Sequence, residues 1–319
     1  MQLFSLDPEP SFSNALAAHL GVPLSPLENR RFEDGEHKIR PLVDPRGQDV
    51  FVVHSLYGEP RWSPHDKLCQ LLFFIAALRD HGAARVTAVM PYLAYARKDR
   101  QTKPFDPVTQ RYVAQLIEAV GAAQVMVLEV HNVAAFQNAF RCTTVHLQAH
   151  HAFEPFVRNL PKEGSLVVAS PDPGGVKRAQ LWRESLEQSL SQTVGFAMVD
   201  KRRSANVVSS ERLVAGDVKN TTVLLMDDLI AGGETVRRAA TALKTAGAHK
   251  VVAFAAHGLF TNGAADVLAD DCISEVVVGD SVPSFRLSND APVRSKLTVV
   301  STAPLFAYAI TASRSNGSM

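Results

Sequence analysis

The sequence predicts an α/β protein with mainly parallel sheets, and three observations lead to this prediction. Apolar runs of strand length alternate with helix-like segments along most of the 319 residues. The stretch 77–88 resembles 242–253, and each copy passes from a helix through a glycine into a strand. Finally, the order of residues in 221–247 is typical of a buried strand, a glycine-bearing loop and a helix. Such an order is expected where open α/β sheets bind ligands.

The elements follow from the apolar pattern in chain order. Helices are expected at 66–82 and from near Pro107 to Gly121, and most of the later strands are separated by further helical segments. Expected strands cover 50–56, 85–93, 124–131, 166–172, 194–200, 223–229, 251–259 and 275–280. Because the repeat spans both halves of the chain, we expect two related domains joined near 148–152. The predicted division is 1–149, 150–302, and a C-terminal helix and tail, 303–319, that packs on the first domain.

Composition narrows the class of protein. Hydrophobic residues make up 46% of the chain and charged residues 20%, as in ordinary globular proteins. The net charge of +1 argues against a nucleic-acid partner. Cys69, Cys142 and Cys272 are widely separated, which favours neither a disulfide framework nor a zinc site. The apolar run 71–78 is too short to span a membrane, and no signal peptide is recognisable. We therefore expect a cytoplasmic protein without membrane contact.

The segment 221–247 carries the clearest candidate site. Asp227 and Asp228 follow an apolar run, and Gly232 and Gly233 come next. Glycines allow backbone N–H groups to approach a phosphate, and a helix N-terminus favours negative charge. Two carboxylates beside such a loop suit a ribose diol or a hydrated Mg²⁺. An acidic strand end followed by an ordinary helix cap remains an equal alternative, and Glu234 places a negative charge where a phosphate would bind.

Other polar motifs interrupt the apolar pattern, and each has a structural alternative. The turn within 31–40 reads as a solvated hairpin. The stretch 90–100 combines tyrosines with basic residues, as a nucleotide site or a surface loop would. His131 ends an apolar strand, where a structural histidine is the commoner case. A second strand–acid–glycine–helix order surrounds Asp172. Three cations head a polar loop at 201–217, where they would be solvated or would neutralise a polyphosphate.

Together these motifs give the chain a resemblance to a known family. FEDGE, PYLAYARKDR, SPDPGG with a following basic pair, DKRR and DDLIAGGET occur in the order and at the spacing of the ribose-phosphate pyrophosphokinase (phosphoribosyl pyrophosphate synthetase) family. The resemblance covers roughly residues 3 to 312. It implies two domains similar to type I phosphoribosyltransferases, and Mg²⁺-dependent homo-oligomers, commonly hexamers or their dimeric unit. It also implies transfer of diphosphate from ATP to the 1-hydroxyl of ribose 5-phosphate, with release of AMP.

The resemblance assigns roles to individual residues. Phe32, Asp34 and Glu36 would hold the adenine and reach into a neighbouring subunit's site, and Arg97 and Lys98 would contact ATP. His131 and Asp172 would position Mg²⁺–ATP and the reacting groups. Lys201 and Arg203, with His131, would be the catalytic residues, stabilising the diphosphoryl group in transfer. Ribose 5-phosphate would be bound by Asp172, Asp227 and Asp228 and by the loop residues Ala231, Gly232, Gly233, Glu234 and Thr235.

Departures from the family pattern keep a second function open. The loop after the paired acids usually reads DTAGT or SGGT, whereas here it reads AGGET. A carboxylate about 4 Å from a phosphate would be repelled by about 4 kcal/mol at an effective dielectric constant near 20. Lys98 stands where the family usually has a glutamine, and Glu129, Val130 and His131 replace the family's usual DLH sequence. The alternative is a weakly active or regulatory homologue that binds nucleotide and associates with active subunits. A phosphoribosyltransferase is a third reading, but it leaves the N-terminal motifs unexplained.

Overall fold

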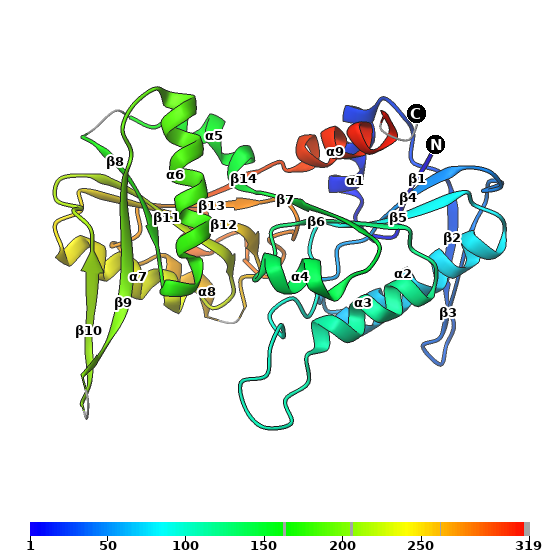
Figure 1. The fold of residues 1–319 in the computed structure, drawn as a ribbon, viewed down its shortest axis with the longest axis horizontal. Helices are drawn as coiled ribbons and strands as arrows, with labels where there is room; N and C mark the ends of the chain where they lie inside the picture. Colours follow the sequence, from blue (N-terminus) through cyan, green and yellow to red (C-terminus); the bar gives the residue numbers. More distant parts are fainter. Residues whose placement is uncertain (162–163, 205–206, 262, 316–319) are drawn as a thin grey trace. The chain divides into compact units, whose positions relative to one another are not determined.

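The protein folds into two α/β units (Figure 1). The computed structural model describes residues 1–161, 164–204, 207–261 and 263–315, and the side chains of 201–212 lie outside this description. One unit comprises Met1–Gln148 and Ser301–Met319, and the other Ala149–Val300. The prediction of an α/β fold with mainly parallel sheets is confirmed, since the antiparallel pairs among the described residues are two hairpins and one isolated bridge between His257 and Asp280.

The first unit is built on a parallel sheet in the order β1-β4-β5-β6-β7. Helices α2, α3 and α4 cover one face of the sheet, and α1 packs against α9 on the other (Figure 1). An antiparallel hairpin, β2–β3, contacts α2. The strands are β1 (Gln2–Ser5), β2 (Leu27–Arg31), β3 (His37–Pro41), β4 (Asp49–Val53), β5 (Arg85–Met90), β6 (Gln124–Leu128) and β7 (Thr143–Leu147). The helices are α1 (Ser11–Leu20), α2 (Pro64–Asp80), α3 (Thr109–Ala119), α4 (Val133–Ala139) and α9 (Ala303–Ser315).

The second unit has a sheet in the order β10-β9-β8-β11-β12-β13-β14. Helices α7 and α8 close one apolar core. On the other face, an aromatic cluster joins α5 and α6 to β12 through Phe153, Trp182 and Phe254. The strands are β8 (Leu166–Ser170), β9 (Gly195–Ser204), β10 (Val207–Ala215), β11 (Thr222–Ile230), β12 (Lys250–Gly258), β13 (Glu275–Gly279) and β14 (Leu297–Val300). The helices are α5 (His150–Arg158), α6 (Val176–Leu190), α7 (Glu234–Thr245) and α8 (Ala264–Leu268), with short 3₁₀ turns η1 (Pro173–Gly175) and η2 (Pro292–Lys296).

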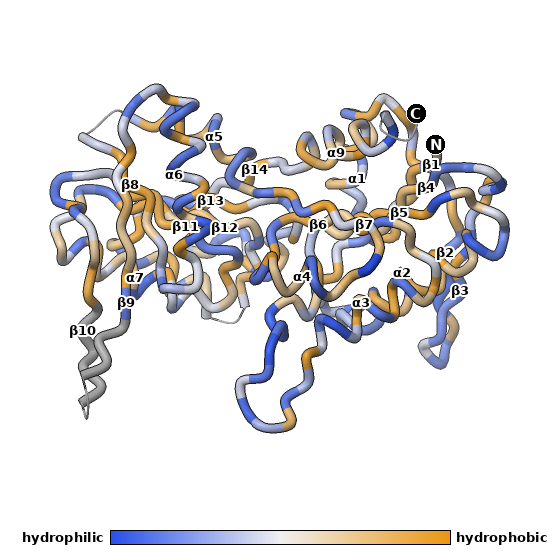
Figure 2. The backbone as a smooth tube through the Cα atoms, in the orientation of Figure 1, coloured by the Kyte–Doolittle hydropathy of each residue, from blue (hydrophilic) through white to orange (hydrophobic). Residues whose placement is uncertain are grey.

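Burial explains why these segments form strands. Parallel strands covered on both faces are nearly continuous apolar runs. β6 is buried at every position, and β12 at every position after Lys250. Figure 2 shows the central strands of the two sheets mainly in hydrophobic colours and the loop before α3 mainly in hydrophilic ones.

The internal repeat corresponds to the same local structure in both units. Gly82 follows the end of α2 with φ 83°, and Gly247 follows the end of α7 with φ 99°. A residue with a side chain rarely adopts this left-handed conformation, so glycine is required where the chain leaves each helix. At the other end of α2, Ser63 and Asp66 form a capping box around Pro64. The glycines explain why the ends of these helices could be read from the sequence, whereas α2 begins at Pro64, two residues before the expected start.

The prediction of a loop at 201–217 is wrong for most of its length, because the described backbone forms two paired strands. Its backbone extends β9 to Ser204 and returns as β10, in an antiparallel hairpin paired from Lys201 with Arg212 to Met198 with Ala215. Backbone pairing at the edge of the sheet forms this hairpin without the apolar alternation that marks a buried strand. The hairpin expected at 31–40 is confirmed, with β2 and β3 paired from Leu27 and Pro41 to Arg31 and His37.

Candidate functional site

The second unit contains a topological switch point between β8 and β11. These two strands are parallel neighbours, but β8 continues to β9 on one side and β11 to β12 on the other. The loops after β8 and β11 therefore diverge at the carboxyl edge of the sheet, where open α/β sheets leave room for a ligand. The segments around Asp172 and Asp227 reach this edge from the two strands.

Asp227 and Asp228 lie within β11, near its carboxyl end. The strand runs from Thr222 to Ile230, so the strand expected at 223–229, which includes both acids, is confirmed within one residue at each end. The backbone N–H of Asp228 donates to Asp227 Oδ1 at 2.8 Å. The two carboxyl groups lie close enough for a side-chain hydrogen bond between them. Asp228 is 5% exposed and faces the Arg178 guanidinium of α6, with 3.9 Å between Oδ1 and Nη1.

Burial raises the pKa of Asp227 well above its ordinary value, and the adjacent negative charge of Asp228 raises it further. Two carboxylates in one poorly solvated place do not ionise independently. The Arg178 guanidinium acts in the opposite direction. The pair can therefore hold a proton that a ligand's hydroxyl groups would displace or share.

This pKa shift predicts a stability effect. A raised pKa in the folded state gives stability below the ordinary value of 3.8 that is lost as pH rises through the folded-state pKa. Asp227→Asn removes the ionisation, so we expect its Tm at pH 8 to exceed that of the parent by about 2–4 °C. The gain should shrink as the pH falls toward 4. Calorimetric scans at several pH values check this. Asp271→Asn, an exposed carboxylate of the same unit, is the control; an equal gain there would contradict the explanation.

The loop after β8 is held in place by its own polar groups. Asp172 Oδ1 accepts a hydrogen bond from the Gly175 N–H at 3.1 Å, and the Ser170 hydroxyl donates to the Asp172 carbonyl at 2.6 Å. A Cβ on Gly175 would lie 2.7 Å from Ser170 Oγ, which is too close. Glycine is therefore required at 175, and the exposed Asp172 carboxylate is presented at the start of α6.

The loop 231–235 ends in the N-terminus of α7. Gly233 has φ 81°, and a Cβ there would lie 2.9 Å from Leu268 Cγ. The Thr261 N–H donates to the Ala231 carbonyl at 3.0 Å, which ties the loop to the segment after β12. The first helical hydrogen bond comes from Arg237 to Gly233, so the amides of Glu234, Thr235 and Val236 precede it. These amides suit an anion.

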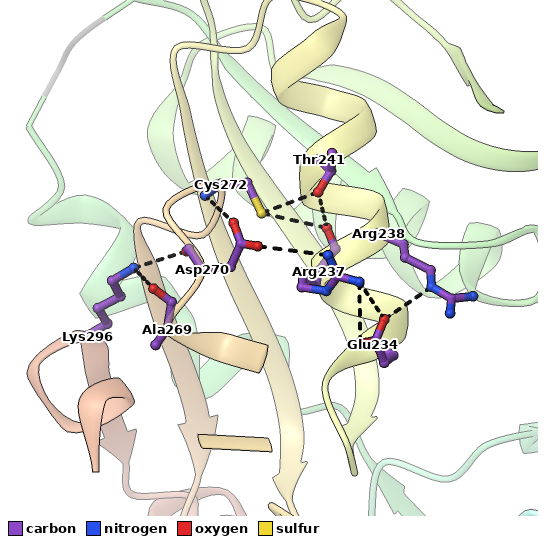
Figure 3. Close-up of polar contacts among 8 residues, drawn as sticks. All are labelled: Glu234, Arg237, Arg238, Thr241, Ala269, Asp270, Cys272 and Lys296. Atoms are coloured by element: carbon purple, nitrogen blue, oxygen red, sulfur yellow. Dashed lines mark hydrogen bonds and ion pairs between the residues drawn. The ribbon is translucent and has the colours of Figure 1, made fainter. Parts of the chain in front are cut away.

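The Glu234 carboxylate is held along its own helix. Its Oε2 lies 2.9 Å from Arg237 Nη2 and 3.1 Å from Arg238 Nε (Figure 3). The hydrogen bond from Arg237 lowers the pKa of Glu234, and Arg238 adds to the effect. The repulsion expected from an isolated carboxylate is thus opposed by two guanidinium groups. Glu234 and its arginines at i+3 and i+4 are neighbours on the helix surface.

The first unit brings other candidate residues to the edge of its own sheet. Arg97 and Lys98 are exposed in the loop after β5, and His131 is exposed after β6. A hydrogen bond of 2.8 Å from Asn132 Nδ2 to Asp99 Oδ2 links these two loops. Since β5 and β6 are parallel neighbours, the basic residues and His131 share one edge.

The remaining candidates of the first unit lie in the hairpin turn. Phe32 is 40% exposed, with the Arg30 guanidinium 5.1 Å from the centre of its ring. Asp34 accepts a hydrogen bond from the Glu36 N–H at 3.0 Å. The hairpin therefore presents an aromatic ring and two acids, Asp34 and Glu36, at one end.

The two expected catalytic cations are placed only by their backbone. Lys201 and Arg203 lie two residues apart in β9. Their side chains lie outside the described residues.

Several contacts were not predicted from the sequence. Arg178 was read only as part of a basic pair, and its approach to Asp228 depends on α6 packing beside β11. The link between Asp99 and Asn132 likewise joins separate loops. The spacing of Glu234 to Arg237 and Arg238 is visible in the sequence and could have revealed that ion pair.

Metal binding can be tested only against the donor groups present. Among the described residues, no three His, Cys, Asp or Glu side chains gather as a metal site. Mg²⁺ is usually held by one or two carboxylates together with water and substrate phosphates. The exposed carboxylate of Asp172 provides oxygen donors of this type, so the residues fit a magnesium ion that arrives with a phosphate ligand.

The fold and these loops define a class: an α/β protein with a phosphate-type loop and paired carboxylates at a switch point. Comparisons with known proteins then define the family. Residues 1–121 match the model described as the N-terminal domain of ribose phosphate pyrophosphokinase, and 208–319 match the phosphoribosyl synthetase-associated domain. The chain belongs to the ribose-phosphate pyrophosphokinase family of enzymes.

Individual relatives extend over almost the whole chain. A ribose-phosphate pyrophosphokinase of Wolinella succinogenes is 35% identical over 97% of this chain and 94% of its own length. One from Caulobacter vibrioides is 36% identical over 97% of this chain and 96% of its own. The crystal structure of phosphoribosylpyrophosphate synthetase from Mycobacterium smegmatis superposes with a TM-score of 0.85 at 32% identity, covering 99% of each chain. No helix of the described chain has the length and hydrophobicity needed to cross a membrane.

Proposed function

We propose that this enzyme transfers diphosphate from Mg²⁺–ATP to the 1-hydroxyl group of ribose 5-phosphate, producing phosphoribosyl pyrophosphate and AMP. The hydroxyl oxygen attacks the β-phosphorus and loses its proton. The bond from the β-phosphorus to the oxygen of the α-phosphate breaks, and AMP leaves with that oxygen. The carboxylate pair and the glycine loop at the switch point carry this proposal, because they suit the diol and the phosphate of one acceptor.

The acceptor would be bound within the second unit. Asp227 and Asp228 accept hydrogen bonds from the ribose hydroxyls, and the Arg178 guanidinium, 3.9 Å from Asp228 Oδ1, helps to orient that carboxylate. The amides at the start of α7 and residues Ala231 to Thr235 surround the 5-phosphate. Asp172, in the loop after the neighbouring strand, is proposed to bind near the reacting end of the sugar.

The adenine and the phosphates of the donor would be bound by residues of the first unit. Phe32, Asp34 and Glu36 are proposed to hold the adenine, and Arg97 and Lys98 the phosphates. His131 and Asp172 are proposed to hold Mg²⁺ with ATP; when bound, this ion would neutralise phosphate charge. Lys201 and Arg203 stabilise the charge of the transferring group, a contribution that phosphoryl transfer needs more than a nucleophile. A cytoplasmic homo-oligomer, in which the hairpin turn serves a neighbouring subunit, belongs to the same proposal.

A direct assay tests the reaction. Incubation with ATP, Mg²⁺ and ribose 5-phosphate should release AMP and form phosphoribosyl pyrophosphate in equal amounts, followed by ³¹P NMR. Ribose without the phosphate and samples with excess EDTA should give no product. Absence of AMP above background would contradict the proposal.

A regulatory homologue is the second candidate. The altered loop favours this candidate, because Ala231 and Gly232 stand where the family usually has an acid and a hydroxyl group. Such a protein would co-purify with an active synthetase and would fail to bind ribose 5-phosphate in calorimetry.

A further inference from the structure

The ion pairs at the start of α7 change how the loop 231–235 can meet a phosphate. Glu234 is the first residue of α7, and its side chain is 47% exposed. The hydrogen bond from Arg237 lowers the pKa of this carboxylate and Arg238 lowers it further, which favours the charged form. An unpaired carboxylate here would weaken the binding of an anion, because its negative charge opposes the partial positive charge of the helix N-terminus. The position of this side chain therefore decides whether the loop is compatible with a phosphate.

Two guanidinium groups hold the carboxylate, and they are held differently. Arg237 also faces a second acid, with 3.9 Å between its Nη1 and Asp270 Oδ2 (Figure 3). Asp270 is itself bound by the Cys272 N–H at 2.9 Å. Arg238 is 57% exposed, and Glu234 is its single ion-pair partner in the part of the chain that the structure describes. Arg237 is thus anchored from two sides, and Arg238 adds a second, more exposed contact.

The segment that anchors Arg237 is itself fixed. Lys296 donates hydrogen bonds to the carbonyls of Ala269, Asp270 and Ile273, at 2.7, 3.0 and 3.1 Å. Cys272 lies beside Thr241 and the Arg237 carbonyl on α7 (Figure 3). The Asp270 carboxylate is therefore presented to Arg237 from a well-bonded turn. This arrangement restrains the guanidinium group that holds Glu234.

We propose that Arg237 and Arg238 are positioning residues for the sugar-phosphate site, acting through Glu234. The three charged side chains carry a formal charge of +1, whereas Glu234 alone carries −1. The arginines direct the carboxylate along the helix and cancel its charge, so that the loop accepts a phosphate despite the glutamate. This inference rests on the proposed function and explains how that function tolerates the altered loop.

The test is a set of variants arranged as a double-mutant cycle. In Arg237→Gln/Arg238→Gln, the released carboxylate should raise the KM for ribose 5-phosphate about tenfold, equivalent to about 1.4 kcal/mol. The KM for ATP and kcat should change less than about threefold, because the loop binds the sugar phosphate equally in the ground state and in the transition state. Adding Glu234→Gln to this pair should restore the KM to within about threefold of the parent.

Controls separate this role from a general loss of structure. Lys244→Gln removes a cation from the opposite end of α7, where its Nζ donates to the His249 carbonyl, and should leave the sugar-phosphate KM unchanged. If the double variant unfolds, Arg238→Gln with and without Glu234→Gln gives the same comparison at the more exposed arginine. An unchanged KM in the arginine variants would overturn the proposal. Failure of Glu234→Gln to rescue them would also overturn it, because the arginines would then act without Glu234.

A binding measurement distinguishes this inference from the proposed function. Calorimetry with ribose 5-phosphate, and with ribose as the reference, reports the site without turnover. Sugar-phosphate binding that weakens in the arginine variants, in a protein that forms no AMP, would contradict the reaction but support the inference. AMP formation with sugar-phosphate constants unaffected by the arginines would support the reaction and overturn the inference.

Discussion

Replacing Lys201 by alanine is expected to lower kcat by about a hundredfold or more, with less than about a threefold change in the KM for ATP. The reason is that the charge stabilised by this ammonium group develops chiefly as the diphosphoryl group is transferred. Initial rates of AMP release at varied ATP and saturating ribose 5-phosphate measure both constants. Arg203→Ala should act in the same direction, since Arg203 lies two residues from Lys201 in β9 and is the second proposed catalytic cation.

Lys219→Ala is the matched control for Lys201, because Lys219 is an exposed lysine of the same unit. Its constants should equal those of the parent enzyme. A Lys201→Ala variant whose KM for ATP rises as much as its kcat falls would contradict the transition-state role. The lysine would then be an ordinary ligand of the bound nucleotide.

Asp228→Asn should reduce kcat/KM for ribose 5-phosphate by about a hundredfold or more, since hydrogen bonds to a charged group are worth about 1.5–3 kcal/mol each. The asparagine would also present an amide group to the Arg178 guanidinium, in place of the carboxylate that faces it now. Calorimetric titration with ribose 5-phosphate measures the loss of binding directly.

The comparison with Asp227 sharpens this prediction. Burial and the neighbouring charge raise the pKa of Asp227 and so disfavour its charged form. Asp227→Asn should therefore weaken sugar-phosphate binding less than Asp228→Asn does. Asp271→Asn, at an exposed position, should have no effect. Equal losses at 227 and 228 would contradict the division of charge inferred for the pair.

Much of the fold could be predicted because its signals are local. Buried runs such as 223–226 show that a segment is a strand, and the glycines at 82 and 247 mark the ends of two helices. The same local order located the paired acids and the glycine loop after them. By contrast, residues 201–212 carry no apolar alternation, so their pairing as β9 and β10 was mistaken for a loop.

The site was only partly visible in the sequence. The identities of Asp172, Asp227 and Asp228 were available, but their common sheet edge depends on β8 pairing with β11. The Glu234 carboxylate was expected to oppose a phosphate, and its ion pairs with Arg237 and Arg238 change that expectation. These roles in binding and catalysis remain predictions that the variants above test.

The sequence by itself determined the α/β class, the repeated unit, the segment that holds the acids and the family resemblance. These depend on periodicity, turn residues and spacing, which act over a few neighbouring positions. Only the tertiary structure decided that the strand order changes direction between β8 and β11, and that Arg178 faces Asp228. Strand order and contacts between distant elements depend on how whole surfaces pack, and no short stretch of sequence contains that information.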